Sequence, residues 1–143
     1  MTPQRVTLIT LGVKDLAAGR AFYGRLGWQE HQAQADVAFF QMHGCVLALF
    51  GLTDLAADQG RPGVALSMGA VTLAQNFRTE AEVDAAFDAA IAVGGKVLKK
   101  PEKVFWGGYS GYWSDPDGHV WEVAMNPFWP LNADGSLTLP HAD

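Results

Sequence analysis

The sequence predicts an α+β fold in which paired βαβββ modules form a curved mixed sheet around a cleft. Three observations lead to this prediction. The order strand, helix, three strands occurs twice along the chain, and tight turn signals separate the strands in each half. In addition, Phe22 and Phe87 occupy corresponding places on the two predicted helices.

The first half begins with an apolar, β-branched segment at residues 6–13, which is typical of a buried strand. Asp15 is placed to cap a helix that runs to about Leu26, where Gly27 is the stop signal. His43 and Gly44 predict a tight turn between two strands. The strands expected after the helix are residues 28–32, 37–42 and 45–50.

The second half repeats this order after a polar, glycine-rich segment with about one helical turn. A strand is expected at the end of residues 64–78. Thr79 and Glu82 have the spacing of a capping box, and Gly94 ends the helix that follows. The remaining strands are expected at residues 96–100, 109–114 and 119–125, with a turn at Asp115-Pro116-Asp117-Gly118 before the last.

These elements predict a single domain over residues 1–143. Two sheets set side by side would enclose a cleft, and clefts between repeats are common ligand sites. The predicted parts are module one at about 5–51, a linker at about 52–63, module two at about 64–125 and a C-terminal tail at 126–143.

Composition narrows the class of protein. With 143 residues, 49% hydrophobic and 17% charged, the chain has the make-up of an ordinary folded domain. The formal charge is −5 and the basic residues are scattered, so we expect no nucleic-acid partner. We also expect no membrane span. Cys45 is the single cysteine and no signal peptide is recognisable, which favours a reducing cytoplasm.

Several motifs, in this order, resemble the vicinal-oxygen-chelate superfamily, which includes glyoxalase, bleomycin-resistance and dioxygenase-like proteins. They span residues 6–125, nearly the whole chain. The motifs are Leu11-Gly12-Val13-Lys14-Asp15-Leu16, Ala21-Phe22-Tyr23, Leu26-Gly27-Trp28, the segment 82–87, Gly94-Gly95 and, most specific, the segment 114–122. The resemblance implies paired βαβββ modules, commonly a homodimer, and a divalent metal in the cleft. It does not define a reaction, because the superfamily hosts many.

The resemblance also implies where the metal ligands should stand. Leu8 occupies the position of the usual first-strand histidine, and Gln75 that of the second-half histidine. Glu122 matches the usual glutamate of the last strand. A hydrocarbon side chain cannot coordinate an ion, and such sites need more than one carboxylate and one amide. We therefore expect the family metal to be missing; if one binds, Glu122 and Gln75 are its candidate ligands.

Without metal, Glu122 and Tyr112 are the candidate catalytic residues. Glu122 alternates with apolar neighbours, so its side chain should point to the opposite face of the strand. There it could act as a general base, or simply be held by a hydroxyl or by Gln75. Tyr112 and Ser110 share one face of the preceding strand. In fosfomycin-modifying relatives the position matching Tyr112 binds substrate; a tyrosine with one backbone or solvent partner is the alternative.

An aromatic and glycine-rich loop at residues 105–109 borders the expected cleft. Trp106 and Tyr109 are candidate ligand-binding residues there, together with Ser110 and Gln75. Such aromatics suit a lid or a stacking wall, but they equally suit a subunit interface. The aromatic segment 126–131 leaves the same choice between packing on the body and packing across a dimer.

Three functional hypotheses follow. The first is a metal-independent protein that binds a small organic molecule in an aromatic-lined cleft, in the cytoplasm and as a homodimer. The second is a diverged lyase or isomerase-like enzyme, metal-dependent or with Glu122 as its base. The third is a cleft filled by side chains, with no ligand.

Overall fold

The computed structural model describes residues 4–68 and 70–140, and the chain divides into two compact units, residues 1–68 and 69–143. Both units pack a helix on one face of a mixed β-sheet, which confirms the predicted α+β class and the repeated pattern. In each, the first strand runs parallel to the last, while the other pairings are antiparallel. The predicted cleft between the modules and the single-domain assignment stay predictions.

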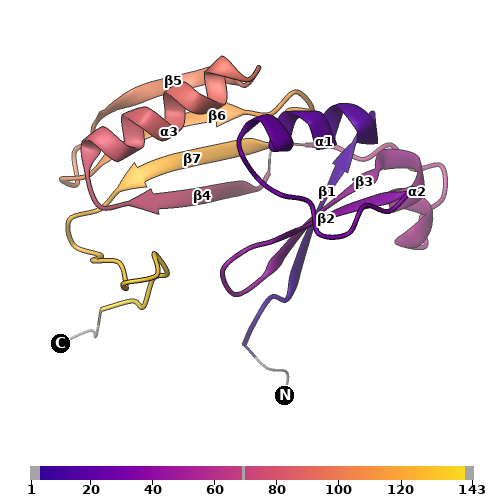
Figure 1. Cartoon of the computed structure of the whole chain (residues 1–143), viewed down its shortest axis with the longest axis horizontal. Coiled ribbons are helices and arrows are strands. Elements are labelled where there is room, and N and C mark those ends of the chain that lie inside the picture. The colour runs from indigo at the N-terminus through magenta and orange to yellow at the C-terminus, as the bar shows by residue number, and fades with distance from the viewer. Residues whose placement is uncertain (1–3, 69, 141–143) are drawn as a thin grey trace. The chain divides into compact units, whose positions relative to one another are not determined.

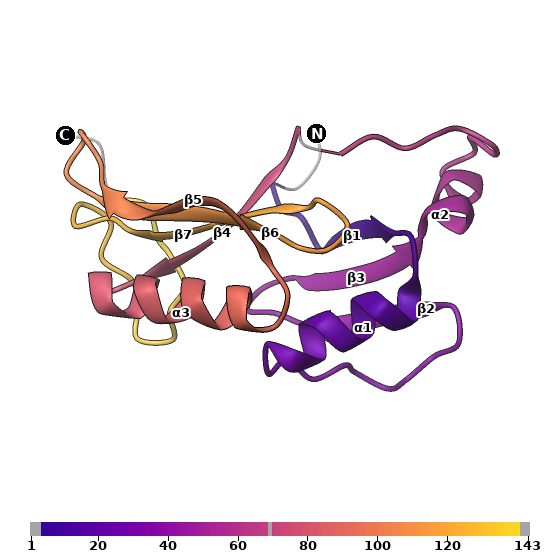
Figure 2. The ribbon, with the colours of Figure 1, turned by 90° about the horizontal axis from the view of Figure 1, so that it is seen from above.

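The first unit contains β1 (Leu8–Val13), α1 (Leu16–Arg25), β2 (Val37–Gln41), β3 (Val46–Gly51) and α2 (Leu52–Asp58) (Figure 1). Its three-stranded sheet has the order β1-β3-β2. The helix α1 lies along one face of this sheet (Figure 2). As predicted, the Asp15 side chain caps α1 by accepting a hydrogen bond from the Ala18 N–H. Phe22 and Tyr23 of the helix are fully buried with Leu49 of β3.

One expectation for this unit is wrong. Residues 28–32 do not form a strand: only Glu30 forms a bridge, to Phe40, and Gln32 has a φ of 40°, which takes the chain out of extended conformation. Module one therefore has one strand fewer than predicted. The helical turn expected in the linker is present as the seven-residue helix α2, and Leu52 of this helix packs against the bare backbone of Gly12.

The second unit contains β4 (Thr72–Phe77), α3 (Glu80–Ala92), β5 (Lys96–Lys103), β6 (Tyr109–Ser114) and β7 (Val120–Met125). Its sheet has the order β4-β7-β6-β5, and α3 covers one face (Figures 1 and 2). Thr79 caps α3 as the capping box predicts. Phe87 of the helix packs over this face, where Trp113 and Trp121 stack with ring centroids 5.7 Å apart.

The predicted turn before β7 is confirmed, and its hydrogen bonds explain its sequence. The buried carboxylate of Asp115 accepts hydrogen bonds from the backbone N–H groups of Asp117 and His119, at 3.0 and 2.8 Å. Gly118 has a φ of 95°, which side chains disfavour. This turn fixes the register of β6 against β7, and so determines which side chains share a face with Glu122.

Candidate functional site

The face of the second sheet opposite α3 carries Glu122 and Tyr112 side by side. Trp121 and Val123 are buried on the α3 face, so Glu122, lying between them on β7, points the other way. The antiparallel register pairs Glu122 with Tyr112 of β6 directly across the strands. Ser110, two residues before Tyr112, is on the same face and buried. The shared face of Ser110 and Tyr112 follows from the strand alternation, and the role of the three residues in a site stays a prediction.

The proximity of Glu122 changes the pKa of the Tyr112 hydroxyl. Burial, the negative charge of Glu122 and a hydrogen bond to the Glu122 carboxylate together raise the pKa of the Tyr112 hydroxyl above its ordinary value. Tyr112 therefore keeps its proton at neutral pH. The face thus presents a hydroxyl beside a carboxylate, which suits polar contacts to a ligand or a proton transfer.

Gln75 and Tyr109 do not join that pair. The parallel register places Gln75 opposite Val123, and the antiparallel register places Tyr109 opposite Met125, so both point to the α3 face. There the Tyr109 hydroxyl donates a hydrogen bond to the Asp84 carboxylate of α3, at 2.7 Å. This bond, with the surrounding acidic charges, raises the pKa of Tyr109 to about 12. The hydroxyl of Tyr109 is thus engaged with α3, away from Glu122.

The aromatic loop between β5 and β6 packs on itself and on the tail. A Cβ on Gly108 would lie 2.0 Å from the Trp106 indole, so the ring rests on the Gly108 backbone. Gly107, with a φ of 100°, receives the ring of Phe128 from the tail in the same way. Phe105 is fully exposed. The tail aromatic Phe128 therefore packs on the body of its own unit.

The donor set that the resemblance implies for a metal does not fit. Leu8 offers no donor atom, and Gln75 lies on the opposite face of the sheet from Glu122, so the two cannot be joint ligands. Of the three implied positions, only Glu122 carries a carboxylate. Within residues 4–68 and 70–140, no group of three or more His, Cys, Asp or Glu side chains is arranged to hold a metal ion.

A pocket that sequence reasoning missed lies within the first unit. It has a volume of about 300 Å³, and Leu8 is part of its wall, so we call it the Leu8 pocket. It opens on the sheet face opposite α1, because the register places Leu8 beside Val46, and Val46 beside Gln41. Its lining residues are Thr7, Leu8, His31, Phe39, Gln41 and Val46.

His31 reaches the Leu8 pocket through the irregular segment between α1 and β2. Its backbone N–H donates to the carbonyl of Phe39, at 2.7 Å, and the bridge between Glu30 and Phe40 lies next to it. This places His31 beside Phe39 at the open edge of β2. The sequence offers one signal for this pocket, because Leu8 and Phe39 lie on strands that are expected to line a cleft. The pairing of β1 with β3, which brings Val46 next to Leu8, was not predictable from the sequence.

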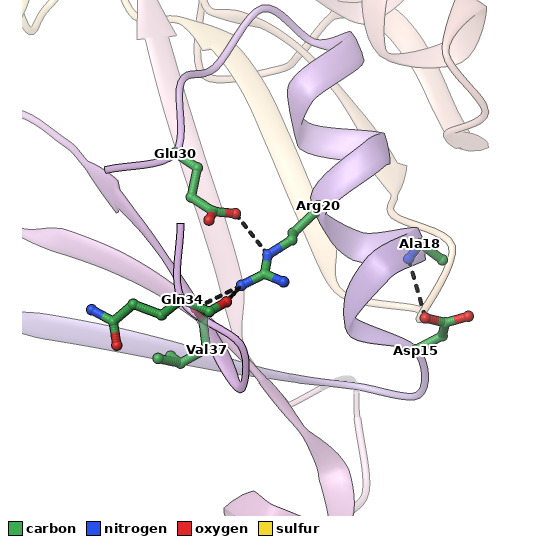
Figure 3. Close-up of polar contacts among 6 residues, drawn as sticks. All are labelled: Asp15, Ala18, Arg20, Glu30, Gln34 and Val37. Atoms are coloured by element: carbon green, nitrogen blue, oxygen red, sulfur yellow. Dashed lines mark hydrogen bonds and ion pairs between the residues drawn. The ribbon is translucent and has the colours of Figure 1, made fainter. Parts of the chain in front are cut away.

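The segment that carries His31 is tied to α1 by Arg20 (Figure 3). The Arg20 Nε donates to the Glu30 carboxylate at 2.8 Å. Its Nη2 donates to the backbone carbonyls of Gln34 and Val37, the latter at 2.9 Å. One guanidinium thus joins three points along residues 30–37, and holds the pocket wall against the helix.

The family model for the Glyoxalase/Bleomycin resistance protein/Dioxygenase superfamily matches residues 5–123. The chain belongs to this superfamily. Among curated proteins none matches the chain. Over the residues that the structure describes, no helix is long and apolar enough to cross a bilayer.

Solved structures agree with the family assignment. A glyoxalase-related enzyme from Fulvimarina pelagi is 42% identical, with a TM-score of 0.88, over 97% of this chain and 100% of that one. A lactoylglutathione lyase from Agrobacterium tumefaciens has 24% identity and a TM-score of 0.68, over 92% and 100% of the two chains. A fosfomycin resistance protein from Listeria monocytogenes has 24% identity and a TM-score of 0.67, over 87% and 95%. The last two comparisons support the fold alone.

Proposed function

We propose that this superfamily member binds a small organic molecule in the Leu8 pocket, without the family's divalent metal. The observation that carries the proposal is the position of Leu8. At the place where the resemblance implies a metal-binding histidine, the chain has a hydrocarbon side chain that forms part of an apolar wall with Phe39 and Val46. Ligand sites are typically concave and mostly apolar with a few polar groups, and the Leu8 pocket matches this description.

Naphthalene is a suitable probe, since it has no polar group and can test the apolar wall alone. We expect titration to shift the backbone amide NMR signals of Leu8, Phe39 and Val46, with the same dissociation constant before and after EDTA treatment. Val46→Trp fills the pocket and should abolish these shifts. Val97→Trp is the matched control, because Val97 is a strand valine of the other unit, 47% exposed on β5.

Two results would contradict the proposal. One is an absence of shifts at the pocket amides in a folded protein, as judged by far-UV circular dichroism. The other is binding that EDTA removes and that added Mg²⁺ or Ni²⁺ restores, which would mean that a metal completes the site.

A second candidate function rests on the Glu122–Tyr112 pair. In it, Glu122 takes a proton from the carbon next to a ligand carbonyl, and Tyr112 donates a hydrogen bond to the resulting enolate oxygen. Incubation of small ketones and aldehydes in D₂O, followed by proton NMR, tests this function. Loss of the α-proton signal that Glu122→Gln abolishes would support it, while equal exchange in both proteins would exclude Glu122 as the base.

The superfamily resemblance and the single cysteine extend the proposal to assembly and compartment. We infer a homodimer, which sedimentation equilibrium can test, and a reducing cytoplasm, which agrees with Cys45 as a free thiol. The predicted lid role of Trp106 is not part of the proposal, since its ring rests on Gly108.

A further inference from the structure

The Leu8 pocket has an apolar floor and one polar edge. Leu8, Phe39 and Val46 form the floor, and the polar edge consists of His31 and Gln41 on the β2 side of the sheet. Thr7 lines the pocket at the start of β1, which is the opposite edge strand. The lining has no lysine, arginine, aspartate or glutamate. A charged ligand group would find no ion pair with such a side chain there, while the apolar floor favours an uncharged ligand.

The volume of the pocket limits the size of the occupant. A cavity of roughly 150 Å³ in another protein holds one benzene ring. The Leu8 pocket, at about 300 Å³, is about twice that size and accommodates two fused or linked rings. A flat ring system also suits a floor built on one face of a sheet, where Phe39 lies between β3 and the segment of His31.

The polar edge has a direction, which Gln41 determines. The Gln41 Nε2 donates to the backbone carbonyls of Met42 and Cys45, at 2.9 and 3.4 Å. Carbonyl oxygens only accept hydrogen bonds, so the amide nitrogen must face the hairpin and the amide oxygen remains as the acceptor. An imidazole also offers an acceptor nitrogen when it is neutral. The edge therefore favours a ligand that donates a hydrogen bond.

We propose that the Leu8 pocket selects an uncharged two-ring molecule that carries a hydrogen-bond donor on one edge, such as a hydroxyl group. The rings lie on Leu8, Phe39 and Val46, and the donor reaches Gln41 Oε1 or the His31 ring. This inference rests on the proposed function, because it names the class of ligand for the same pocket.

Three probes of one size test the inference: 2-naphthol, 2-methoxynaphthalene and 2-naphthoate. The first donates a hydrogen bond, the second only accepts one, and the third is an anion. We expect 2-naphthol to bind about tenfold more tightly than 2-methoxynaphthalene, the factor that about 1.4 kcal/mol represents. We expect 2-naphthoate to bind more weakly than both. Amide NMR shifts at Leu8 and Val46 locate each probe in the pocket.

Two variants assign the preference to the polar edge. Gln41→Met and His31→Phe keep an apolar wall but remove the polar atoms, and each should lower the ratio of the two affinities by about threefold or more. The ratio is insensitive to a general loosening of the hairpin, which would weaken both probes alike. Gln59→Met, at the exposed end of α2, is the control and should leave the ratio unchanged.

The outcomes separate this inference from the proposed function. Equal binding of 2-naphthol and 2-methoxynaphthalene in the pocket, lost in Val46→Trp, would overturn the ligand class and leave the binding function standing. Tightest binding by 2-naphthoate would overturn it as well. An absence of shifts in the pocket with all three probes and with naphthalene would overturn both.

Discussion

Replacing Arg20 with lysine tests whether one side chain holds the wall of the Leu8 pocket. The planar guanidinium of Arg20 donates hydrogen bonds to the Glu30 carboxylate and to the backbone carbonyls of Gln34 and Val37 at the same time. Lysine keeps the charge but offers a single ammonium group, so at least one of these bonds is lost. A hydrogen bond to a charged group contributes about 1.5–3 kcal/mol.

The free energy that these hydrogen bonds contribute is at the low end of that range. The side chains of Arg20 and Glu30 are 28% and 17% exposed, so water competes for their polar groups. We expect Arg20→Lys to lower the free energy of unfolding by about 1–2 kcal/mol, which for a chain of 143 residues is a fall in Tm of about 3–7 °C. Thermal denaturation followed by circular dichroism measures this. The affinity for 2-naphthol should fall too, because His31 is carried by the segment that Arg20 holds.

The matched control is Arg61→Lys. Arg61 is exposed and donates to the side chain of Gln59, so its replacement should change the free energy of unfolding by less than about 0.5 kcal/mol. Equal Tm values for Arg20→Lys and Arg61→Lys would refute the reasoning. So would an unchanged affinity for 2-naphthol in Arg20→Lys, since the pocket wall would then not depend on Arg20.

Two further predictions concern the second unit and the glycines. Spectrophotometric titration at 295 nm should find a pKa of about 12 for Tyr109, and Asp84→Asn should return this pKa towards its ordinary value near 10. Because the folded pKa is raised, the stabilising contribution of the Tyr109–Asp84 bond is complete below pH 10. This contribution is lost as the pH rises towards 12. Gly111→Ala should destabilise the protein by about 2 kcal/mol or more, because its Cβ would lie 2.7 and 2.9 Å from backbone atoms of Pro101 and Lys99. Gly24→Ala is the control for Gly111→Ala, because no atom lies within 4 Å of a Cβ placed on Gly24. Alanine at this position should stabilise α1 by about 0.5–1 kcal/mol. Equal destabilisation by the two substitutions would contradict the steric argument.

Local signals predicted the helices and turns of this fold well. The caps Asp15 and Thr79 form hydrogen bonds within three residues of themselves, so their patterns can be recognised without knowledge of the fold. The segment 28–32 was mispredicted because its conformation depends on distant partners. Glu30 is held by Arg20 of α1, and Trp28 stacks on Tyr23, with ring centroids 5.2 Å apart. Such tertiary contacts override a strand-like composition.

The candidate site of the second unit was predictable where alternation alone decides the face. Glu122 lies between Trp121 and Val123, which identify the buried face, so its own direction follows from the strand period. Gln75 has no such neighbours: β4 has no fully buried residue, and its pattern fits either face. The pairing of Gln75 with Val123 decides the matter, and a register slip of one residue would have brought Gln75 to Glu122 instead.

Leu8 is better understood through its sheet neighbours than through the histidine it replaces. In the parallel register Leu8 is next to Val46, which is next to Gln41, so an apolar pair continues into the polar edge of the pocket. The sheet neighbour of Leu8 is a valine, and Phe39 lines the same floor. Leu8 and its neighbours on the pocket floor are therefore all apolar, as expected of a pocket suited to an apolar ligand.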